Sequence, residues 1–307
     1  MPQTLEIDRS RLRARYIFTG RLVLDTALHI GGGRESATVT DSPILRDSLG
    51  QPLIPGSSFK GAFRAGVERI LPNLPGFRTC LLVQGNNDCL STNKPLLQDY
   101  GRVSEAASQG RAMGIGNTRT AQDDRNTLQK LSRDDWKGKE LDEDNLLNLL
   151  DEFLCDTCKT FGSVYLAAAA QFHDLPISVW AETTDIRDGV GIDRDSERAI
   201  DQIKFDYEVV PARSEFEFRL TLENPCQRDL GLIAIGLQEF TNGMIPLGGI
   251  RSRGLGRCHL EDVKVAKLDF SDPDCFRNYL LAPSNWAEEA AQPLGDFINR
   301  QIDTLLP

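Results

Sequence analysis

The 307-residue sequence has no apolar run long enough to span a bilayer and no stretch that resembles a signal peptide. We therefore expect a soluble, cytoplasmic protein with no membrane partner. Seven cysteines, an odd number, in a chain without an export signal argue against a disulfide framework. Free thiols or a metal site are the remaining roles for them.

Positive charge is also in short supply, because 35 Lys and Arg against 45 Asp and Glu leave a net charge of −10. The basic residues gather near the N-terminus, where residues 1–70 hold ten Lys and Arg against seven Asp and Glu, a net of +3. An acidic chain can still bind a nucleic acid through one basic face. Because it would bind poorly alone, the charge favours a subunit of a larger assembly.

The densest cluster of glycine and arginine reads Gly-Gly-Ile-Arg-Ser-Arg-Gly, from Gly248 to Gly254. Glycine lets one backbone approach another or a ligand, and arginine offers a planar fork that fits phosphates. The run predicts a loop that lies against a nucleic-acid backbone. A glycine-rich hairpin with solvated arginines is the alternative.

Three N-terminal segments accompany this loop. They read Leu-His-Ile-Gly-Gly-Gly over residues 28–33, Thr-Asp-Ser-Pro-Ile-Leu-Arg-Asp over 40–47, and Pro-Leu-Ile-Pro-Gly-Ser-Ser-Phe-Lys-Gly-Ala-Phe-Arg over 52–64. In this order the segments resemble the RAMP superfamily of CRISPR-associated proteins. The likeness is greatest to the subunit that polymerises along the guide RNA in type III effector complexes. It covers residues 15–70 and about 160–266.

Seven elements are expected, and their core follows the order strand, helix, strand, strand, helix, strand. Strands are expected at residues 15–25, 176–182 and 257–265, and a strand pair at 205–210 and 216–222. Helices are expected from Ser57 or Ser58, as cap, to about residue 70 and at residues 230–240. This α+β order fits a ferredoxin-like, or RRM-like, fold, which the resemblance also implies.

The chain also divides by composition. We expect residues 1–71 and 161–267 to form the RAMP core, 72–160 a polar insertion, and 268–307 an acidic helical tail. The insertion and the tail depart from the plainest members of the family. They suggest a specialised subunit, present once per complex, of a type III-D-like system.

The resemblance implies guide-RNA contacts in the first loop, at the start of the first helix and in the glycine-arginine loop. The residues are His29, Gly31, Gly32, Ser57, Ser58, Lys60, Arg64, Gly248, Gly249, Arg251, Ser252 and Arg253. On spacing alone, Lys60 and Arg64 fit solvated charges equally well, and a lone histidine such as His29 is most often structural. Only three histidines are present, so an enzyme that processes guide RNA through a histidine pair has little support.

Asp41 stands just before Ser42-Pro43 in a loop rich in glycine, serine and threonine. By itself this pattern is typical of an aspartate that opens a turn. The resemblance implies that Asp41 matches the aspartate essential for cutting target RNA. Cleavage there would need Mg²⁺ or Mn²⁺ and would use the ribose 2′-hydroxyl.

Residues 183–204 match the position of the family's thumb, a β-hairpin that inserts between guide and target RNA. The residues that fit are Thr184, Ile186, Arg187, Val190, Ile192 and Arg194. Their apolar members could wedge a base step, as intercalating side chains do. A solvated hairpin or a short helix is the alternative.

Cys155 and Cys158 form a C-x-x-C, and Cys80 and Cys89 form a looser pair with eight residues between them. Four thiolates can close a tetrahedral structural Zn²⁺ site that would hold the insertion together. A redox pair and unrelated buried cysteines are the alternatives.

The resemblance, together with these observations, implies a guide-RNA-binding backbone subunit of a type III CRISPR ribonucleoprotein in antiviral defence, with Asp41 cutting the complementary target RNA. Its partners would be guide RNA, target RNA, other RAMP subunits and the large signalling subunit. A non-catalytic scaffold of the same complex is the main alternative, and a stand-alone zinc-stapled RNA-binding module is another.

Overall fold

The computed structural model describes residues 11–32, 40–80, 151, 154–163, 166–192, 194, 195, 199–281 and 291–305. The chain forms two compact units. The first comprises Met1–Ala14, Glu68–Ala170 and Leu222–Leu232, and the second comprises Arg15–Val67, Gln171–Thr221 and Ile233–Pro307. No helix within the described ranges combines the length and the apolar character needed to cross a membrane.

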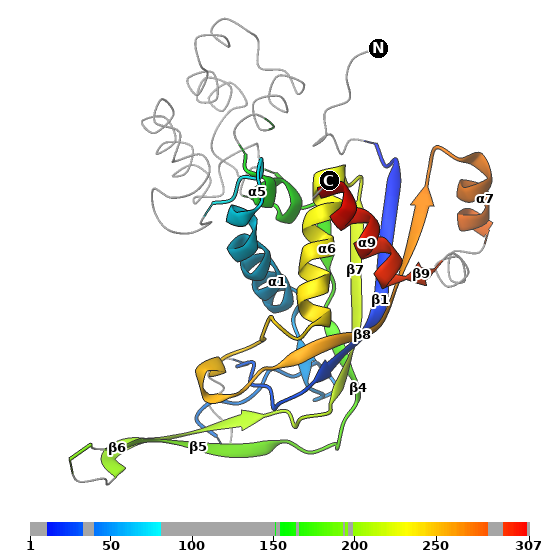
Figure 1. Cartoon of the computed structure of the whole chain (residues 1–307). Coiled ribbons are helices and arrows are strands. Elements are labelled where there is room, and N and C mark those ends of the chain that lie inside the picture. Colours follow the sequence, from blue (N-terminus) through cyan, green and yellow to red (C-terminus); the bar gives the residue numbers. More distant parts are fainter. Residues whose placement is uncertain are drawn as a thin grey trace, which may run out of the picture. The chain divides into compact units, whose positions relative to one another are not determined.

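A mixed α/β architecture is built around one large sheet (Figure 1). Its strands lie in the order β2-β4-β7-β1-β8-β9, with β3 pairing with β7. The bounds are β1 Ala14–Leu24, β2 Leu53–Ile54, β3 Ala170–Phe172, β4 Leu175–Val179, β7 Glu215–Glu223, β8 Cys258–Asp269 and β9 Gln292–Pro293. The pairs β2–β4, β4–β7 and β8–β9 are antiparallel.

Aromatic residues pack helices α1 (Gly56–Ile70) and α6 (Gln227–Thr241) on one face of the sheet (Figure 1). Phe59 stacks on Phe240 with ring centroids 4.5 Å apart, and it lies 5.5 Å from Phe218 of β7. Of the stripe Phe59, Phe63, Val67 and Ile70, which the helical spacing of the sequence predicts to be buried, the first three are fully buried and Ile70 is half-buried.

The other two described helices of the C-terminal part use opposite faces of β1. Phe297 of α9 (Leu294–Leu305) lies 5.2 Å from Phe18, on the same face as α1 and α6. Ile17 points the other way, because side chains alternate along a strand, and packs with β8 and with Tyr279 of α7 (Pro273–Leu281). Helices therefore do occur in the expected tail, although β8 continues to Asp269 before they begin.

The second sheet is a hairpin of β5 (Asp185–Ile192) and β6 (Ala199–Val209). It pairs Asp185 with Val209 and Val190 with Lys204. A hairpin was expected at 183–204, and it extends five residues further. The expected pairing of 205–210 with 216–222 is wrong, since β6 pairs with β5 while β7 pairs with β4.

The start of α1 also differs from the expectation that Ser57 or Ser58 caps it. The helix begins at Gly56, so both serines lie inside its first turn. The Gly56 N–H donates to the Asp174 carboxylate, 2.7 Å away. A side chain more than a hundred residues distant therefore satisfies one of the free N–H groups of the helix start.

The first compact unit contains the short helix α5 (Asp156–Phe161) and the 3₁₀ turn Leu71–Asn73. Asp156 is buried and accepts hydrogen bonds from the Arg78 N–H and from the Arg228 guanidinium, at 2.6 and 2.9 Å. The expected insertion 72–160 lies outside the described residues from 81 to 150.

Candidate nucleic-acid interface

The glycine-arginine loop contacts the loop that contains His29. The Gly249 N–H donates to the His29 carbonyl at 2.9 Å, and a Cβ on Gly248 would lie 2.2 Å from that oxygen. Gly248 also has φ +73°, a conformation that glycine adopts without strain. Gly248 is thus needed for a backbone-to-backbone approach inside the protein, and its RNA contact stays a prediction.

Arg251, Ser252 and Arg253 form an exposed 3₁₀ turn at the tip of this loop. The Arg253 guanidinium lies 5.7 Å from the ring centre of Phe205 on β6. Two exposed arginines, of which Arg253 lies beside the exposed Phe205 ring, offer a surface for phosphates and for base stacking. This arrangement suits the RNA contact predicted from the sequence.

Asp41 is exposed and is joined to β6 by a reciprocal pair of hydrogen bonds. The Asp41 N–H donates to Asp206 Oδ1 at 2.6 Å, and the Asp206 N–H donates to Asp41 Oδ2 at 3.1 Å. Ser42 then forms a parallel bridge with Tyr207. The loop that contains Asp41 therefore runs along the hairpin strand, at the end where β6 approaches Val209.

His29 lies beneath this loop and is 7% exposed. Its Nδ1 donates to the Glu208 carbonyl at 2.7 Å, because a carbonyl can only accept. In the neutral ring, Nε2 is then an acceptor, and it lies 3.3 Å from the Ser42 hydroxyl. The ring packs edge-on against Tyr207. His29 therefore supports the neighbour of Asp41, and any direct RNA contact or proton transfer by it stays a prediction.

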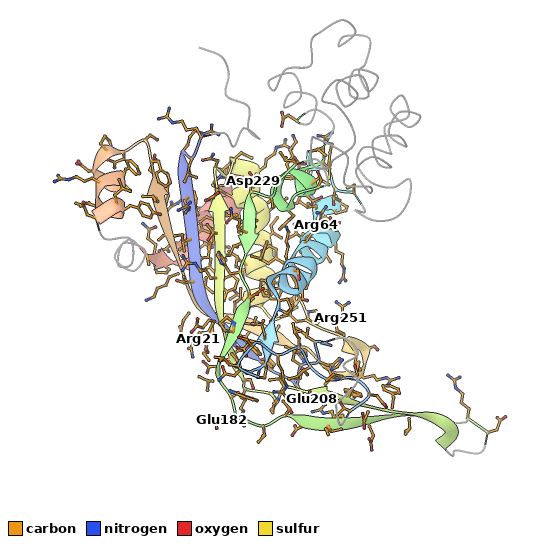
Figure 2. The ribbon with its side chains drawn as sticks, turned by 180° about the vertical axis from the view of Figure 1, so that it is seen from behind. Arg21, Arg64, Glu182, Glu208, Asp229 and Arg251 are labelled. Carbon is orange, nitrogen blue, oxygen red and sulfur yellow. The ribbon has the colours of Figure 1, made fainter. Side chains whose placement is uncertain are left out.

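Glu208 is 9% exposed, and its place near the hairpin is labelled in Figure 2. Its hydrogen bonds link the loop, the base of the hairpin and His29. Its carboxylate accepts hydrogen bonds from Thr184, Arg46 and the Ile44 N–H, and the Arg46 contact is also an ion pair. Burial disfavours the charged form, but the bonds from Thr184, Ile44 and Arg46 outweigh burial and lower the pKa of Glu208. The sequence reasoning missed Glu208. The available signal was a lone acid within an apolar run, Tyr-Glu-Val-Val.

The helix-start residues differ in exposure. Ser57 and Ser58 are exposed, Lys60 is half-buried, and Arg64 is 7% exposed. Burial, and then repulsion from Arg64, lower the pKa of Lys60. An anion at this position would relieve that repulsion. The burial of Arg64 nevertheless favours a packing role for its side chain, while Lys60 and the serines remain accessible to RNA.

The residues predicted for the thumb lie on or next to the β5–β6 hairpin. Ile186 and Val190 are 53% and 45% exposed on β5, a high exposure for large apolar side chains. Arg187 is exposed on the same strand, and Arg194 is exposed in the turn. Ile192 pairs with Ala199 in the strand register. Thr184 instead bonds to Glu208, at the end of the hairpin opposite the turn.

Three of the four cysteines predicted to bind Zn²⁺ meet in the first compact unit. Their Sγ atoms lie within 4.8 Å of one another, with Cys80 at 3.5 Å from both Cys155 and Cys158. Sulfurs on one tetrahedral zinc are about 3.7 Å apart, from a Zn–S bond of about 2.3 Å. The three thiols thus fit a metal ion, and Cys89 lies outside the described residues.

The Mg²⁺ or Mn²⁺ expected at Asp41 has fewer candidate protein ligands than the cysteine cluster offers. Among the described residues, the cysteine cluster is the only group of three or more His, Cys, Asp or Glu side chains that lie close enough together to hold one metal ion. Asp41 and Asp206 supply two neighbouring carboxylates. Mg²⁺ is commonly held by one or two carboxylates together with water and substrate phosphates, so the pair is compatible with an ion that binds with RNA.

Comparison with known proteins places these features in a family. A family model described as the RAMP superfamily matches residues 21–259. The chain is 26% identical over 263 residues to the CRISPR system Cms endoribonuclease Csm3 of Streptococcus thermophilus, covering 83% of this chain and 91% of that protein.

Shorter matches are closer in sequence. Proteins with the same name from Methanocaldococcus jannaschii and Enterococcus italicus are 47% and 42% identical over 65 and 60 residues. These matches span 26% and 28% of the length of those two relatives. Since the family match extends from β1 through both site loops and the hairpin to the start of β8, the chain belongs to the RAMP superfamily of CRISPR-associated proteins.

Proposed function

We propose that this chain is a guide-RNA-binding backbone subunit of a type III CRISPR ribonucleoprotein, and that it cleaves complementary target RNA at Asp41. The similar proteins named Csm3 endoribonucleases support the reaction class. The strand order β4-β7-β1-β8, with one helix after β1 and one after β7, supports a ferredoxin-like core. Other RAMP subunits and the large signalling subunit would be its partners.

The observation that most supports cleavage is the placement of Asp41. Its exposed carboxylate is fixed by the Asp206 N–H, beside a hairpin whose apolar side chains face solvent. Asp41 would position the 2′-hydroxyl of the target ribose, whose oxygen attacks the adjacent phosphorus and displaces the 5′-oxygen. The hydroxyl proton leaves and the 5′-oxygen takes up a proton. A bound Mg²⁺ or Mn²⁺ would supply charge stabilisation to the phosphate.

The guide would be held by its backbone through Arg251, Arg253 and Lys60. Sequence would be read by base pairing between guide and target, because arginine and lysine contacts to phosphate carry no sequence information. Such contacts would weaken with salt.

A non-catalytic scaffold remains the second candidate. The reciprocal bonds between Asp41 and Asp206 by themselves give Asp41 a structural reason to be an aspartate. In this case the loop and the hairpin would bind RNA without cutting it.

Target cleavage by the assembled complex distinguishes the two. Asp41→Asn removes the charge but keeps an oxygen for the Asp206 N–H. The matched control is Asp47→Asn, because Asp47 accepts the N–H groups of Leu49 and Gln51 in a nearby turn and an amide oxygen can do the same. With Mg²⁺ present and every cut mapped, Asp41→Asn should abolish one specific cut while guide and target stay bound. An unchanged cut pattern would make the chain a scaffold.

We also propose that Cys80, Cys155 and Cys158 hold a structural Zn²⁺ with Cys89 as the fourth ligand. Zinc content of the purified complex, measured by atomic absorption, should fall by one ion per chain in Cys158→Ser. Cys275→Ser, which changes a cysteine outside the cluster, should leave it unchanged. Equal zinc in both variants would refute this site.

A further inference from the structure

Glu208 makes contacts that no other residue of the candidate interface makes. Its carboxylate Oε1 accepts from the Thr184 hydroxyl at 2.5 Å and from Arg46, and its Oε2 accepts from the Ile44 N–H at 3.0 Å. Its backbone N–H donates to the Ser42 carbonyl at 3.0 Å, and its own carbonyl accepts from His29. One residue therefore contacts three positions of the segment 42–46, as well as Thr184, just before β5, and the His29 loop.

These contacts fix the position of Asp41 along the hairpin. Asp41 adjoins Ser42, and its own bonds go to Asp206, two residues before Glu208 on the same strand. Asp206 and Glu208 lie two residues apart on β6, so the two side chains lie on the same face of the strand and define the register of the loop against it. A slip of one residue would place both side chains on the opposite face. The loop cannot move along β6 without breaking the Glu208 bonds to Ile44 and Ser42.

We propose that Glu208 is a positioning residue for cleavage at Asp41: it locks the segment 41–46 to the base of the β5–β6 hairpin and so sets where Asp41 meets the target strand. The inference rests on the proposed function of Asp41. Glu208 is buried and does not touch RNA; it acts through Ile44, Ser42 and Arg46.

The negative charge and full acceptor character of Glu208 matter for this role. All three groups that face its carboxylate are donors, namely a hydroxyl, a guanidinium and a backbone N–H. In Glu208→Gln, the amide NH₂ would face at least one of these donors and leave a buried pair unsatisfied. The loop would then lose part of its attachment although the side chain keeps its size.

The test compares Glu208→Gln with Glu217→Gln in the assembled complex. Glu217 is an exposed glutamate on β7, so its change controls for the loss of one negative charge. Two quantities are measured: the single-turnover cutting rate at saturating target, and the position of each cut at single-nucleotide resolution. Target affinity and melting temperature are measured in parallel.

We expect Glu208→Gln to slow the Asp41-dependent cut by about ten- to a hundred-fold, as a misplacement of about 1 Å does, and to spread it over neighbouring phosphodiesters. Target affinity should change less than three-fold, on the order of 0.6 kcal/mol. The melting temperature should fall in either case, because buried hydrogen bonds are lost. A merely structural role would also lower the affinity, and the remaining cut would keep its position. Glu217→Gln should behave as wild type.

Thr184→Val provides an independent variant if Glu208→Gln does not assemble, since it removes one donor to Oε1 and keeps the carboxylate and the side-chain shape. Like Glu208→Gln, Thr184→Val should spread the cut over neighbouring phosphodiesters, but with a smaller loss of cutting rate. The positioning role is overturned if Asp41→Asn abolishes the cut but Glu208→Gln cuts at the normal rate and position. If only Thr184→Val assembles, the same result in that variant overturns it. If Asp41→Asn cuts normally, the proposed function itself fails.

Discussion

Alanine at Gly248 and at Gly254 should have very different effects on stability. Both glycines have positive φ, +73° and +87°, so either substitution pays the left-handed penalty of about 1–2 kcal/mol. At Gly254 nothing lies within 4 Å of the new Cβ. At Gly248 the Cβ would lie 2.2 Å from the His29 carbonyl oxygen and 3.0 Å from Leu28 Cδ1.

The magnitude follows from that approach. An ordinary contact needs about 3.4 Å, so the His29 backbone or the loop must move by about 1 Å, and overpacking of this kind costs about 1–3 kcal/mol. Gly254→Ala should thus lose about 1–2 kcal/mol, and Gly248→Ala about 2–5 kcal/mol in all. Urea unfolding of the two variants against wild type measures both.

The same pair separates a folding role from an RNA role. If the glycines are there to admit an RNA backbone, Gly254→Ala should weaken RNA binding most, because its Cβ points into open space. If Gly248 serves the fold, as its contact with His29 indicates, Gly248→Ala should lose stability before it loses binding. Equal losses of unfolding free energy in both variants would refute the reasoning from the His29 contact.

Three further predictions concern buried groups. The lowered pKa of Glu208 contributes stability that is fully present above about pH 4.5 and is lost as the pH falls through the lowered value. The difference in melting temperature between wild type and Glu208→Gln should therefore disappear in acid. A difference that is constant with pH would contradict this. Phe59→Ala should cost about 3–5 kcal/mol in urea unfolding, because Phe59 is 0% exposed and stacks on Phe240; a loss below about 1 kcal/mol would be inconsistent with that packing. Burial raises the pKa of Cys258 to about 12, so iodoacetamide at neutral pH should leave it unlabelled by mass spectrometry in the folded protein, and rapid labelling would show that the thiol is accessible.

Elements with a strong internal pattern could be predicted from the sequence. Phe18, Leu22 and Leu24 alternate and are buried in β1, and α6 ends at Thr241, just before Gly243, whose φ is +67°. Such signals lie within one element, so neighbouring residues suffice to reveal them.

Partners between elements could not be predicted in the same way. Alternation marked residues 205–210 as a strand, but not its pairing with β5 instead of β7. The cap on Gly56 comes from Asp174, and the residue that joins Ile44 is Glu208, 164 positions away. These contacts depend on how the sheet and the hairpin bring distant segments together, which no local pattern specifies.

The hairpin base also changes how the candidate site should be understood. Asp41, Ser42, Ile44 and Arg46 each bond to β6, so the loop has anchors on the hairpin at almost every second residue. If one residue of such a hydrogen-bonded network moved alone, it would leave polar groups without partners. A displacement of one member is therefore passed on to the others. If RNA displaces the hairpin, the loop must follow it. In the proposed function, Asp41 would therefore keep its place relative to the hairpin rather than to the large sheet, and the cut would be measured from the point where the hairpin enters the duplex.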